Sequence, residues 1–557
     1  MKAARHTAHR PATRSRTALA LLCAMTFVAV AACGDDDDGS QGGSQTTASS
    51  GGATTSAGGG TSPSTEGGGA PSDADTEASL RIYFTAPPTT MDPHKATGVV
   101  FSHAYHFPVF DRLLMVDTSL EVQPMLATDW EFGPDGRTLD LDLRTDVQFH
   151  SGRPVDAAAV KASLERAKTL EGSTQAGALS SVTSIDVVSP SRVRLNLSGG
   201  NAALLATLTT GAGVVMDPEV FNDPAVDMAT NPSMAGSGPW VVTAFVPNQS
   251  ATYERAPGTY WDDRAGLLKN VHIEFTSDQA ARINAIRSGA ADMVFINIGQ
   301  SGNVTDLTSG DRYVLHKIPG PTEVVLWFND QRNEFANVKV RQAIKQAIDP
   351  EPIAEGLLNG DCVAEPGIYP PDAWAHDSIE DPFPYDPDAA RQALAESGVD
   401  DLSFTAITNA GSASNDVAVV VQAQLAEVGI EMNVQPGQTA ANTQLYTSRD
   451  YEAFINPISQ TNDPDGVLSN QIVDGYRVAG AAADRLRPLK EQALNPSLSQ
   501  DERRELYTQI SQEIMDDVLL VPICFASTLW LTEGDVQGVE DIVWTGILDF
   551  RSLYVEG

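Results

Sequence analysis

The sequence predicts an α/β protein that folds into more than one domain. Short apolar runs with strand character, at residues 271–275, 293–296 and 402–407, alternate with segments of helical character. About 480 residues follow a low-complexity N-terminal part, and a single hydrophobic core seldom holds that many. We therefore expect two or three domains in which helices pack on sheets.

Local signals place several elements of this fold. Residues 138–143 (TLDLDL) alternate apolar and polar side chains, which is the pattern of a half-buried strand. Asp156 is a suitable N-cap for a helix that runs to about residue 170. Asp386 is a second N-cap, followed by proline at the first helical position, and Gly398 is expected to end that helix.

The first 32 residues have the three parts of a secretory signal peptide. Residues 1–16 contain no acidic residue and carry these basic residues: Lys2, Arg5, Arg10, Arg14 and Arg16. Residues 17–30 form an apolar run that ends in the small pair Ala31-Ala32. This run is too short to cross a bilayer, which takes roughly 20 residues.

The residues around the predicted cleavage point resemble the lipobox of bacterial lipoproteins. They read Val30-Ala31-Ala32-Cys33. The resemblance implies that residues 1–32 are removed and that the Cys33 thiol carries a diacylglycerol. The protein would then be anchored by lipid at the extracytoplasmic face of the cell membrane. The alternative is an ordinary cleaved signal followed by an incidental cysteine.

Residues 33–78 are expected to form a disordered tether. Gly, Ser, Thr and Asp dominate this stretch, which therefore cannot bury enough apolar surface to offset the entropy cost of ordering. The whole chain has a formal net charge of −37. Such an acidic chain is a poor partner for nucleic acid, which is bound by basic patches.

Two cysteines, Cys362 and Cys524, remain in the body of the chain once Cys23 is assigned to the signal and Cys33 to the lipid. In an oxidising compartment they could form a disulfide. Two isolated buried thiols are the alternative, because sequence alone cannot place the pair within bonding distance.

The body of the chain carries an ordered series of motifs, each of which is weak alone. In the first half they are Pro124-x-Leu126-Ala127, Asp135-Gly136, Phe149-His150-x-Gly152, Gly236-x-Gly238-Pro239-Trp240 and Tyr260-Trp261. In the second half they are Arg287-x-Gly289, Phe328-Asn329, Val340-Arg341-Gln342-Ala343, Tyr385-Asp386-Pro387 and Asn462-Asp463-Pro464-Asp465. From about residue 80 to the end, their order resembles the solute-binding proteins of oligopeptide, dipeptide and nickel ABC importers, known as extracellular solute-binding protein family 5.

The resemblance implies a type II periplasmic-binding-protein-like fold, in which two α/β lobes are joined by a hinge. The first lobe would be discontinuous, with its N-terminal part at residues 79–320 and a return segment at residues 525–557. The second lobe would cover residues 321–524. The two crossovers between the lobes are expected near residues 315–328 and 521–528.

The resemblance also implies solute binding rather than catalysis. The protein would capture a small solute between its lobes, favoured to be a peptide or peptide-like, and deliver it as a monomer to an ABC permease. No catalytic residue, cofactor or resident metal is assigned. The alternatives are a non-peptide solute, such as a metal chelate or an oligosaccharide, or a secreted hydrolase, although the sequence has no GxSxG, HExxH or GxxxxGK motif.

Family position gives eight candidate ligand contacts: Thr89, Thr90, Thr322, Glu323, Gln460, Thr461, Asn462 and Asp463. Peptide-binding members have an aspartate four residues before the loop proline, where it holds the α-ammonium group of the peptide. This chain has Gln460 there, and a neutral amide lacks the charge for that bond. Asp463 or Glu323 would have to replace it. The alternatives are that Asp463 is a turn residue and that Glu323 is a solvated surface charge.

His103 and His106 lie three residues apart, a spacing at which two imidazoles can share one helix face and one metal. No histidine follows His376 to complete such a site from the second lobe. We therefore expect two partly buried surface histidines and no metal site.

Overall fold

The computed structural model describes residues 70–96, 99–332, 334–376, 379–459, 461–475, 477–542 and 548–557. The predicted signal peptide, Cys33 and most of the predicted tether lie outside these residues. Within the predicted tether, the Asp75 N–H donates to the Val555 carbonyl oxygen at 2.8 Å, so the last residues before position 79 pair with the C-terminus. Within the described ranges, no helix is long and apolar enough to span a membrane.

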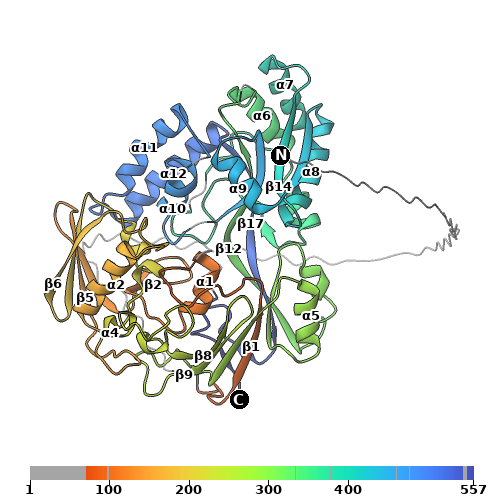
Figure 1. Ribbon diagram of the computed structural model, residues 1–557. Helices are drawn as coiled ribbons and strands as arrows, with labels where there is room; N and C mark the ends of the chain where they lie inside the picture. Colours follow the sequence, from red (N-terminus) through yellow and green to blue (C-terminus); the bar gives the residue numbers. More distant parts are fainter. Residues whose placement is uncertain are drawn as a thin grey trace, which may run out of the picture. The chain divides into compact units, whose positions relative to one another are not determined.

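The fold is organised around one mixed sheet of 11 strands (Figure 1). Its strands are β1 (Ser79–Phe84), β8 (Trp240–Val246), β9 (Ser250–Arg255), β10 (Asn270–Phe275), β11 (Met293–Ile296), β12 (Tyr313–Phe328), β13 (Cys362–Val363), β14 (Ser403–Asn409), β15 (Glu431–Gly437), β16 (Ala453–Ser459) and β17 (Leu520–Glu533). They run in the order β15-β14-β16-β12-β17-β11-β1-β10-β9-β8, with β13 paired to β17 beside this path.

Within the part of the chain that the structure describes, three smaller sheets accompany the large one. The first has four strands in the order β4-β5-β7-β6, namely β4 (Ala127–Phe132), β5 (Thr138–Leu143), β7 (Arg192–Leu197) and β6 (Val182–Ser189). The other two are pairs, β2 (Leu114–Val116) with β3 (Val122–Pro124) and β18 (Val536–Gln537) with β19 (Tyr554–Val555).

Helices and short helical turns connect these strands. The α-helices are α1 (Val99–His106), α2 (Ala157–Thr169), α3 (Leu204–Thr207), α4 (Pro218–Phe221), α5 (Gln279–Arg287), α6 (Val338–Ala347), α7 (Pro387–Ser397), α8 (Ala413–Glu427), α9 (Thr439–Thr447), α10 (Asp465–Val467), α11 (Ala481–Ala493) and α12 (Gln500–Asp516). The 3-10 and π turns are η1 (Gly211–Gly213), η2 (Ser233–Ala235), η3 (Ser301–Val304), η4 (Pro352–Leu357) and η5 (Leu468–Ile472).

The two long strands β12 and β17 run antiparallel to each other through the middle of the large sheet (Figure 1). They occupy the two segments that were predicted to be crossovers. We call the residues before β12 and after β17 lobe I, and the residues between the two strands lobe II. The predicted lobe boundaries at residues 320/321 and 524/525 fall within these strands and stay a prediction.

The pairing of β12 with β17 shifts in register at two places, of which the smaller lies between Val324 and Val325. The larger break lies between Ile318 and Thr322, over the sequence Pro-Gly-Pro. A Cβ atom on Gly320 would lie 1.8 Å from the Ala526 carbonyl oxygen, so only glycine fits at this crossing. This break divides β12 into a first half, residues 313–318, that pairs with β17, and a second half, residues 322–328, that pairs with both β17 and β16 of lobe II.

The hydrophobic cores follow the same division. One cluster lies in lobe II and gathers residues from β12, β14 and β16 with helices α6 and α8. A second cluster fills the four-stranded sheet and α2 of lobe I. The largest cluster joins side chains of lobe I, such as Phe84, to side chains of lobe II, such as Tyr507, across the interface.

The local signals in the sequence are confirmed. Strand β5 has the predicted bounds. The Asp156 carboxylate accepts a hydrogen bond from the Ala159 N–H at 2.9 Å and caps α2. Asp386 caps α7, which ends at Gly398. These elements form as expected because each signal acts over a few residues.

Candidate functional site

Two of the predicted ligand residues, Asn462 and Asp463, line a cavity of about 570 Å³. Its walls come from both lobes: residues 120–122, 130–132, 202, 205 and 206 of lobe I face residues 374, 462, 463, 496, 498, 500 and 503 of lobe II. A cavity of this size suits a small organic solute or a short peptide. We call it the interlobe cavity.

Aromatic and charged side chains share the lining of the interlobe cavity. Trp130 and Phe132 contribute from β4, and Trp374 contributes from lobe II. Charged groups come from Glu121, Glu131, Asp463 and Arg503. Sequence reasoning did not single out Trp374 or Arg503, because no local pattern around either residue indicates that it faces the opposite lobe.

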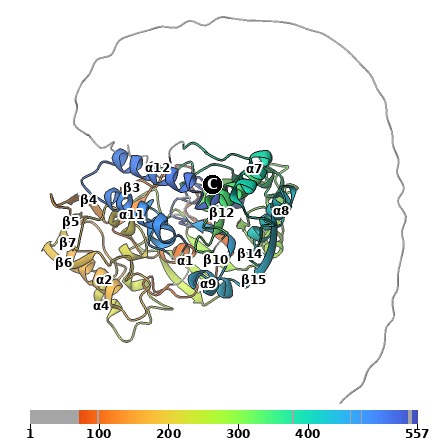
Figure 2. The ribbon, with the colours of Figure 1, turned by 90° about the horizontal axis from the view of Figure 1, so that it is seen from above.

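Asn462 connects the two lobes directly. Its side-chain amide donates to the Thr209 hydroxyl of lobe I at 2.7 Å, and the amide is buried. Nearby, the Ala202 N–H of lobe I donates to the Leu494 carbonyl oxygen of lobe II at 2.9 Å. Pro496 of lobe II packs against Gly136 and Gly200 of lobe I. We call these three interlobe contacts the rim contact. Residues 494–496 lie between helices α11 and α12, and Figures 1 and 2 show these helices beside the small four-stranded sheet.

Asp463 is held by lobe II itself. Arg503 of α12 donates to its carboxylate at 2.7 Å, and the two side chains are almost completely buried. Tyr507 lies next along the same helix face, and Arg503 donates to its hydroxyl at 3.1 Å. Asp463 also accepts a hydrogen bond from the Asp465 N–H, as the turn interpretation predicted. Its charge is thus compensated within the protein.

Glu323 lies on β12 beside the register break and is fully buried. The alternative of a solvated surface charge is therefore wrong, because β16 and β17 flank the strand on both sides at this position. Neither carboxyl oxygen has a hydrogen-bond partner among the described residues. Burial raises the pKa of Glu323 well above its ordinary value.

The remaining candidates are more dispersed and do not line the interlobe cavity. Thr89 is exposed, whereas the Thr90 carbonyl oxygen bonds the His106 ring at 2.9 Å. Thr322 is half-buried opposite Ser459. The exposed Thr461 donates to the Asp463 carbonyl oxygen at 2.8 Å. Gln460 lies outside the described residues.

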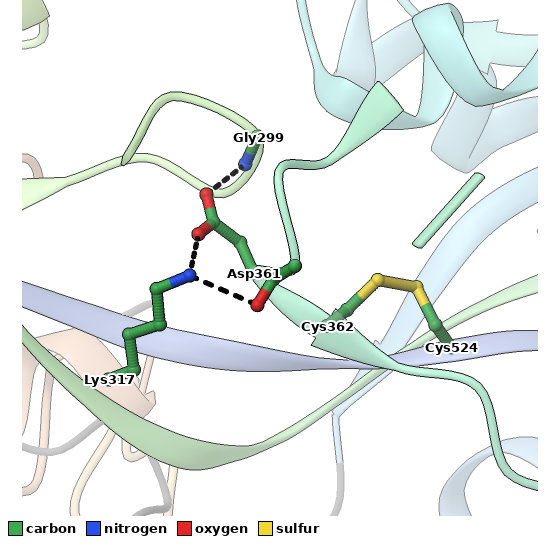
Figure 3. The surroundings of a disulfide bond; sticks show 6 residues. Gly299, Lys317, Asp361, Cys362 and Cys524 are labelled. Atoms are coloured by element: carbon green, nitrogen blue, oxygen red, sulfur yellow. Dashed lines mark hydrogen bonds and ion pairs between the residues drawn. A yellow bond between two sulfur atoms is a disulfide. The ribbon is translucent and has the colours of Figure 1, made fainter. Parts of the chain in front are cut away.

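The hinge side of the interface is held by charge and by a disulfide (Figure 3). The buried Asp361 of lobe II accepts the Gly299 N–H of lobe I at 2.9 Å and lies 2.9 Å from Lys317 Nζ on β12. The next residue, Cys362, forms a disulfide with Cys524 on β17. The structure thus decides the cysteine pairing that the sequence left open. We call Gly299, Lys317, Asp361 and the disulfide the hinge contact.

A match to a family model identifies the family to which this two-lobed chain belongs. The model described as "Bacterial extracellular solute-binding proteins, family 5 Middle" matches residues 121–476. The chain belongs to this family. The resemblance seen in the motifs is therefore confirmed.

Curated relatives and solved structures agree with this assignment. This family 5 protein is 26% identical over 362 residues to a glutathione-binding protein, GsiB, of Salmonella paratyphi A. The alignment covers 64% of this chain and 69% of the relative. The chain is also 26% identical over 499 residues to a probable di/tripeptide-binding protein of Pseudomonas aeruginosa, which covers 83% of this chain and 93% of the relative. NikA from Brucella suis, solved with Fe(III)-EDTA, has a TM-score of 0.75 at 20% identity, over 85% of this chain and 99% of NikA. The structural likeness supports the predicted two-lobed type II fold, which is confirmed.

This family 5 protein buries His103 and His106, so the expectation of partly exposed surface histidines is wrong. Both rings are at most 3% exposed. His106 bonds the Thr90 carbonyl oxygen, and His103 accepts the Gly211 N–H at 3.3 Å while stacking on Phe107. Helix α1 carries both rings into the core of lobe I, away from solvent.

A second cavity of about 370 Å³ lies mostly within lobe I of the family 5 protein. Arg112 and Arg551 line it, and each is paired with an aspartate: Arg112 with Asp549 at 3.2 Å, and Arg551 with Asp111 at 2.9 Å. These charges are mutually compensated, as are those of Asp463 and Arg503 in the interlobe cavity, but lobe II contributes only Asn462 to the lining of this second cavity.

Proposed function

We propose that this protein is the lipid-anchored substrate-binding protein of an ABC importer. It captures a small solute between its two lobes outside the cytoplasm and delivers it, as a monomer, to a membrane permease. Binding alone is required of it, so the proposal includes no catalytic residue. The lobe limits at residues 79–320, 321–524 and 525–557 are part of this proposal.

The interlobe cavity is the observation that carries the proposal. It is lined from both lobes, which are linked by only two strands, β12 and β17. A solute held there would contact both lobes only when they are closed, and this differential contact is what drives closure. Asn462 and Asp463 are proposed ligand residues because they line this cavity.

A peptide or peptide-like solute is favoured. Among the relatives, one is named for glutathione and another for di- and tripeptides. The cavity combines aromatic walls with carboxylates and hydrogen-bonding side chains, which suits a small polar solute such as a peptide. A metal chelate is the second class to consider, since NikA was solved with Fe(III)-EDTA.

Native mass spectrometry of the full chain, purified without refolding, tests the solute. A retained mass of a few hundred daltons that fragments as a peptide is the expected result. A retained chelate or sugar would replace the peptide class and keep the binding function. A bare protein mass, together with no thermal stabilisation by peptides, sugars or chelates, would refute solute capture.

The lipid anchor is tested separately with Cys33→Ala. We expect the variant to move from the membrane fraction to the soluble fraction, because it lacks the thiol that would carry the acyl chains. A conservative substitution beside the predicted lipobox, Ser40→Ala, is the control and should remain in the membrane fraction. Unchanged membrane retention of Cys33→Ala would refute the anchor.

A further inference from the structure

Glu323 differs from the other buried acids of the described chain in having no basic partner. The other buried acids are seven aspartates, and each lies within 4.0 Å of a lysine or arginine nitrogen: Asp92, Asp111, Asp140, Asp217, Asp361, Asp463 and Asp465. Glu323 is 0% exposed, and neither of its oxygens has a partner among the described residues. Burying an unpaired carboxyl group is costly, so its presence calls for an explanation.

The strand geometry shows which way this carboxyl group faces. Side chains alternate along β12, and those of Val324 and Leu326 belong to the core of lobe II. Val325 and Trp327 belong instead to the cluster that joins the two lobes. Glu323 shares their face, opposite Ile458 of β16, which is in the same cluster. The carboxyl group therefore lies on the face of β12 that packs into the cluster shared by the two lobes, next to the register break; it is not one of the residues that line the interlobe cavity.

Among the described residues, no basic group is paired with Glu323. Burial is the cause of the raised pKa of Glu323, and no charged group opposes it. Burial thus favours the neutral, protonated form of this carboxyl group over the carboxylate. By contrast, Asp463, the other candidate for binding an ammonium group, is already neutralised by Arg503.

We propose that Glu323 is the specificity residue that receives a cationic group of the solute, an ammonium in the first instance. This inference rests on the proposed solute capture and names the solute class. When the cation arrives, the O–H bond of the neutral acid breaks, its proton passes to solvent, and the carboxylate accepts an N–H hydrogen bond from the ammonium. Such a charge-assisted bond in a dry site is strong, which suits an anchor.

The release of a proton on binding predicts how the affinity for the solute depends on pH. One proton is released for each cation bound, so the affinity for a cationic solute rises with pH, by up to tenfold per unit, while the acid stays protonated in the free protein. The rise ends where the solute amine itself loses its proton, near pH 8 for an α-amino group. A protonated Glu323 that donated to a solute carbonyl or carboxylate would give the opposite or no dependence.

The test uses the full chain and matched probes. The probes are a set of unmodified di- and tripeptides, the same peptides with N-acetylated termini, and a set of neutral sugars and metal chelates. Thermal shift finds the binders, and calorimetry at pH 6 and pH 7, in buffers of different ionisation enthalpy, then gives the dissociation constant and the protons released. We expect binding by free-amine peptides only, tighter at pH 7 than at pH 6, with net release of protons on binding.

Variants complete the test. Glu323→Gln should weaken binding of the free-amine peptide at least 100-fold and abolish its pH dependence. Glu431→Gln, an exposed position on β15, should bind like the wild type. Proton release by the wild-type protein keeps the test valid even if Glu323→Gln folds poorly.

The remaining outcomes separate this inference from the proposed function. Equal binding of acetylated and free peptides, binding by sugars or chelates alone, or an affinity independent of pH would overturn the role of Glu323 and leave solute capture standing. No binding by any probe, together with a bare native mass, would overturn both.

Discussion

Two of the regions in which the two lobes touch are built differently. The hinge contact joins a buried carboxylate, Asp361, to Lys317 and to a backbone N–H of the opposite lobe, and a disulfide fixes the adjacent residue (Figure 3). The rim contact uses one amide-hydroxyl bond, one backbone hydrogen bond and the packing of Pro496 on two glycines. The hinge contact is charged and covalently braced, whereas the rim contact is neutral.

This difference indicates where the lobes separate. A neutral hydrogen bond contributes about 1 kcal/mol and is readily exchanged for water, whereas a bond to a charged group contributes about 1.5–3 kcal/mol. The contrast predicts that the lobes part at the rim and pivot about the hinge contact. The interlobe cavity opens on the rim side, since Asn462 and Pro496 line it.

The largest expected effect comes from removing the disulfide. The double variant Cys362→Ser, Cys524→Ser should lose about 2–5 kcal/mol in the free energy of unfolding, because the bond links residues 162 positions apart and restricts the unfolded chain. Denaturant unfolding measures it. Reductant should lower the wild-type stability to the same level and leave the variant unchanged. Equal stability of oxidised and reduced wild type would contradict the bracing role.

The second effect is a loss of stability at acid pH, which should leave both contact regions intact. The buried His94 accepts a hydrogen bond from Arg166, and burial lowers the pKa of His94 to about 3. In the unfolded chain the histidine has a pKa of about 6.5, so the unfolded state binds more protons below that pH, and stability falls as the pH drops from 6.5 towards 3. The loss from His94 alone should reach about 2 kcal/mol at pH 5.

Urea unfolding at pH 7.5 and pH 5 measures this loss, and His94→Gln provides the control. The variant should lose less stability between the two pH values than the wild type. Neither the hinge contact nor the rim contact, as defined above, includes a histidine, so the Asp361 contacts should persist at pH 5. Identical pH dependence in the variant would show that His94 is not the acid-sensitive group.

Sequence reasoning succeeded where the information is local and failed where it is distant. The caps at Asp156 and Asp386 depend on a few neighbouring residues, and the family motifs supplied the hinge strands. The pairing of Asp463 with Arg503 joins residues 40 positions apart, and that of Asn462 with Thr209 joins residues 253 positions apart. No local pattern encodes such pairs, so the environment of each candidate ligand residue emerged only with the tertiary structure.

A smaller effect should follow from Asp361→Asn. The amide oxygen can still accept the Gly299 N–H, but the charge that holds Lys317 is lost, so we expect about 1–2 kcal/mol lower stability. Asp306→Asn is the matched control, because it removes an exposed ion pair with Arg287 and should cost under about 1 kcal/mol. Thermal unfolding of the two variants compares them. Equal losses would mean that the hinge contact is no stronger than a surface pair.

The smallest effect tests the rim alone. A Cβ atom on Gly200 would lie 2.9 Å from Pro496 Cδ, whereas one on Gly199 would meet nothing within 4 Å. Gly200→Ala should therefore disfavour the closed rim by about 1 kcal/mol, and Gly199→Ala should not.

Amide hydrogen exchange of the solute-free protein measures this difference in rim stability. The Ala202 N–H, which donates to the Leu494 carbonyl oxygen, should exchange about fivefold faster in Gly200→Ala and at the wild-type rate in Gly199→Ala. The Ser527 N–H, which donates to the Asp361 carbonyl oxygen, should be unaffected in both variants, because it lies at the hinge. If its exchange rises together with that of Ala202, the interface opens as one body and the distinction between a firm hinge and a labile rim is wrong.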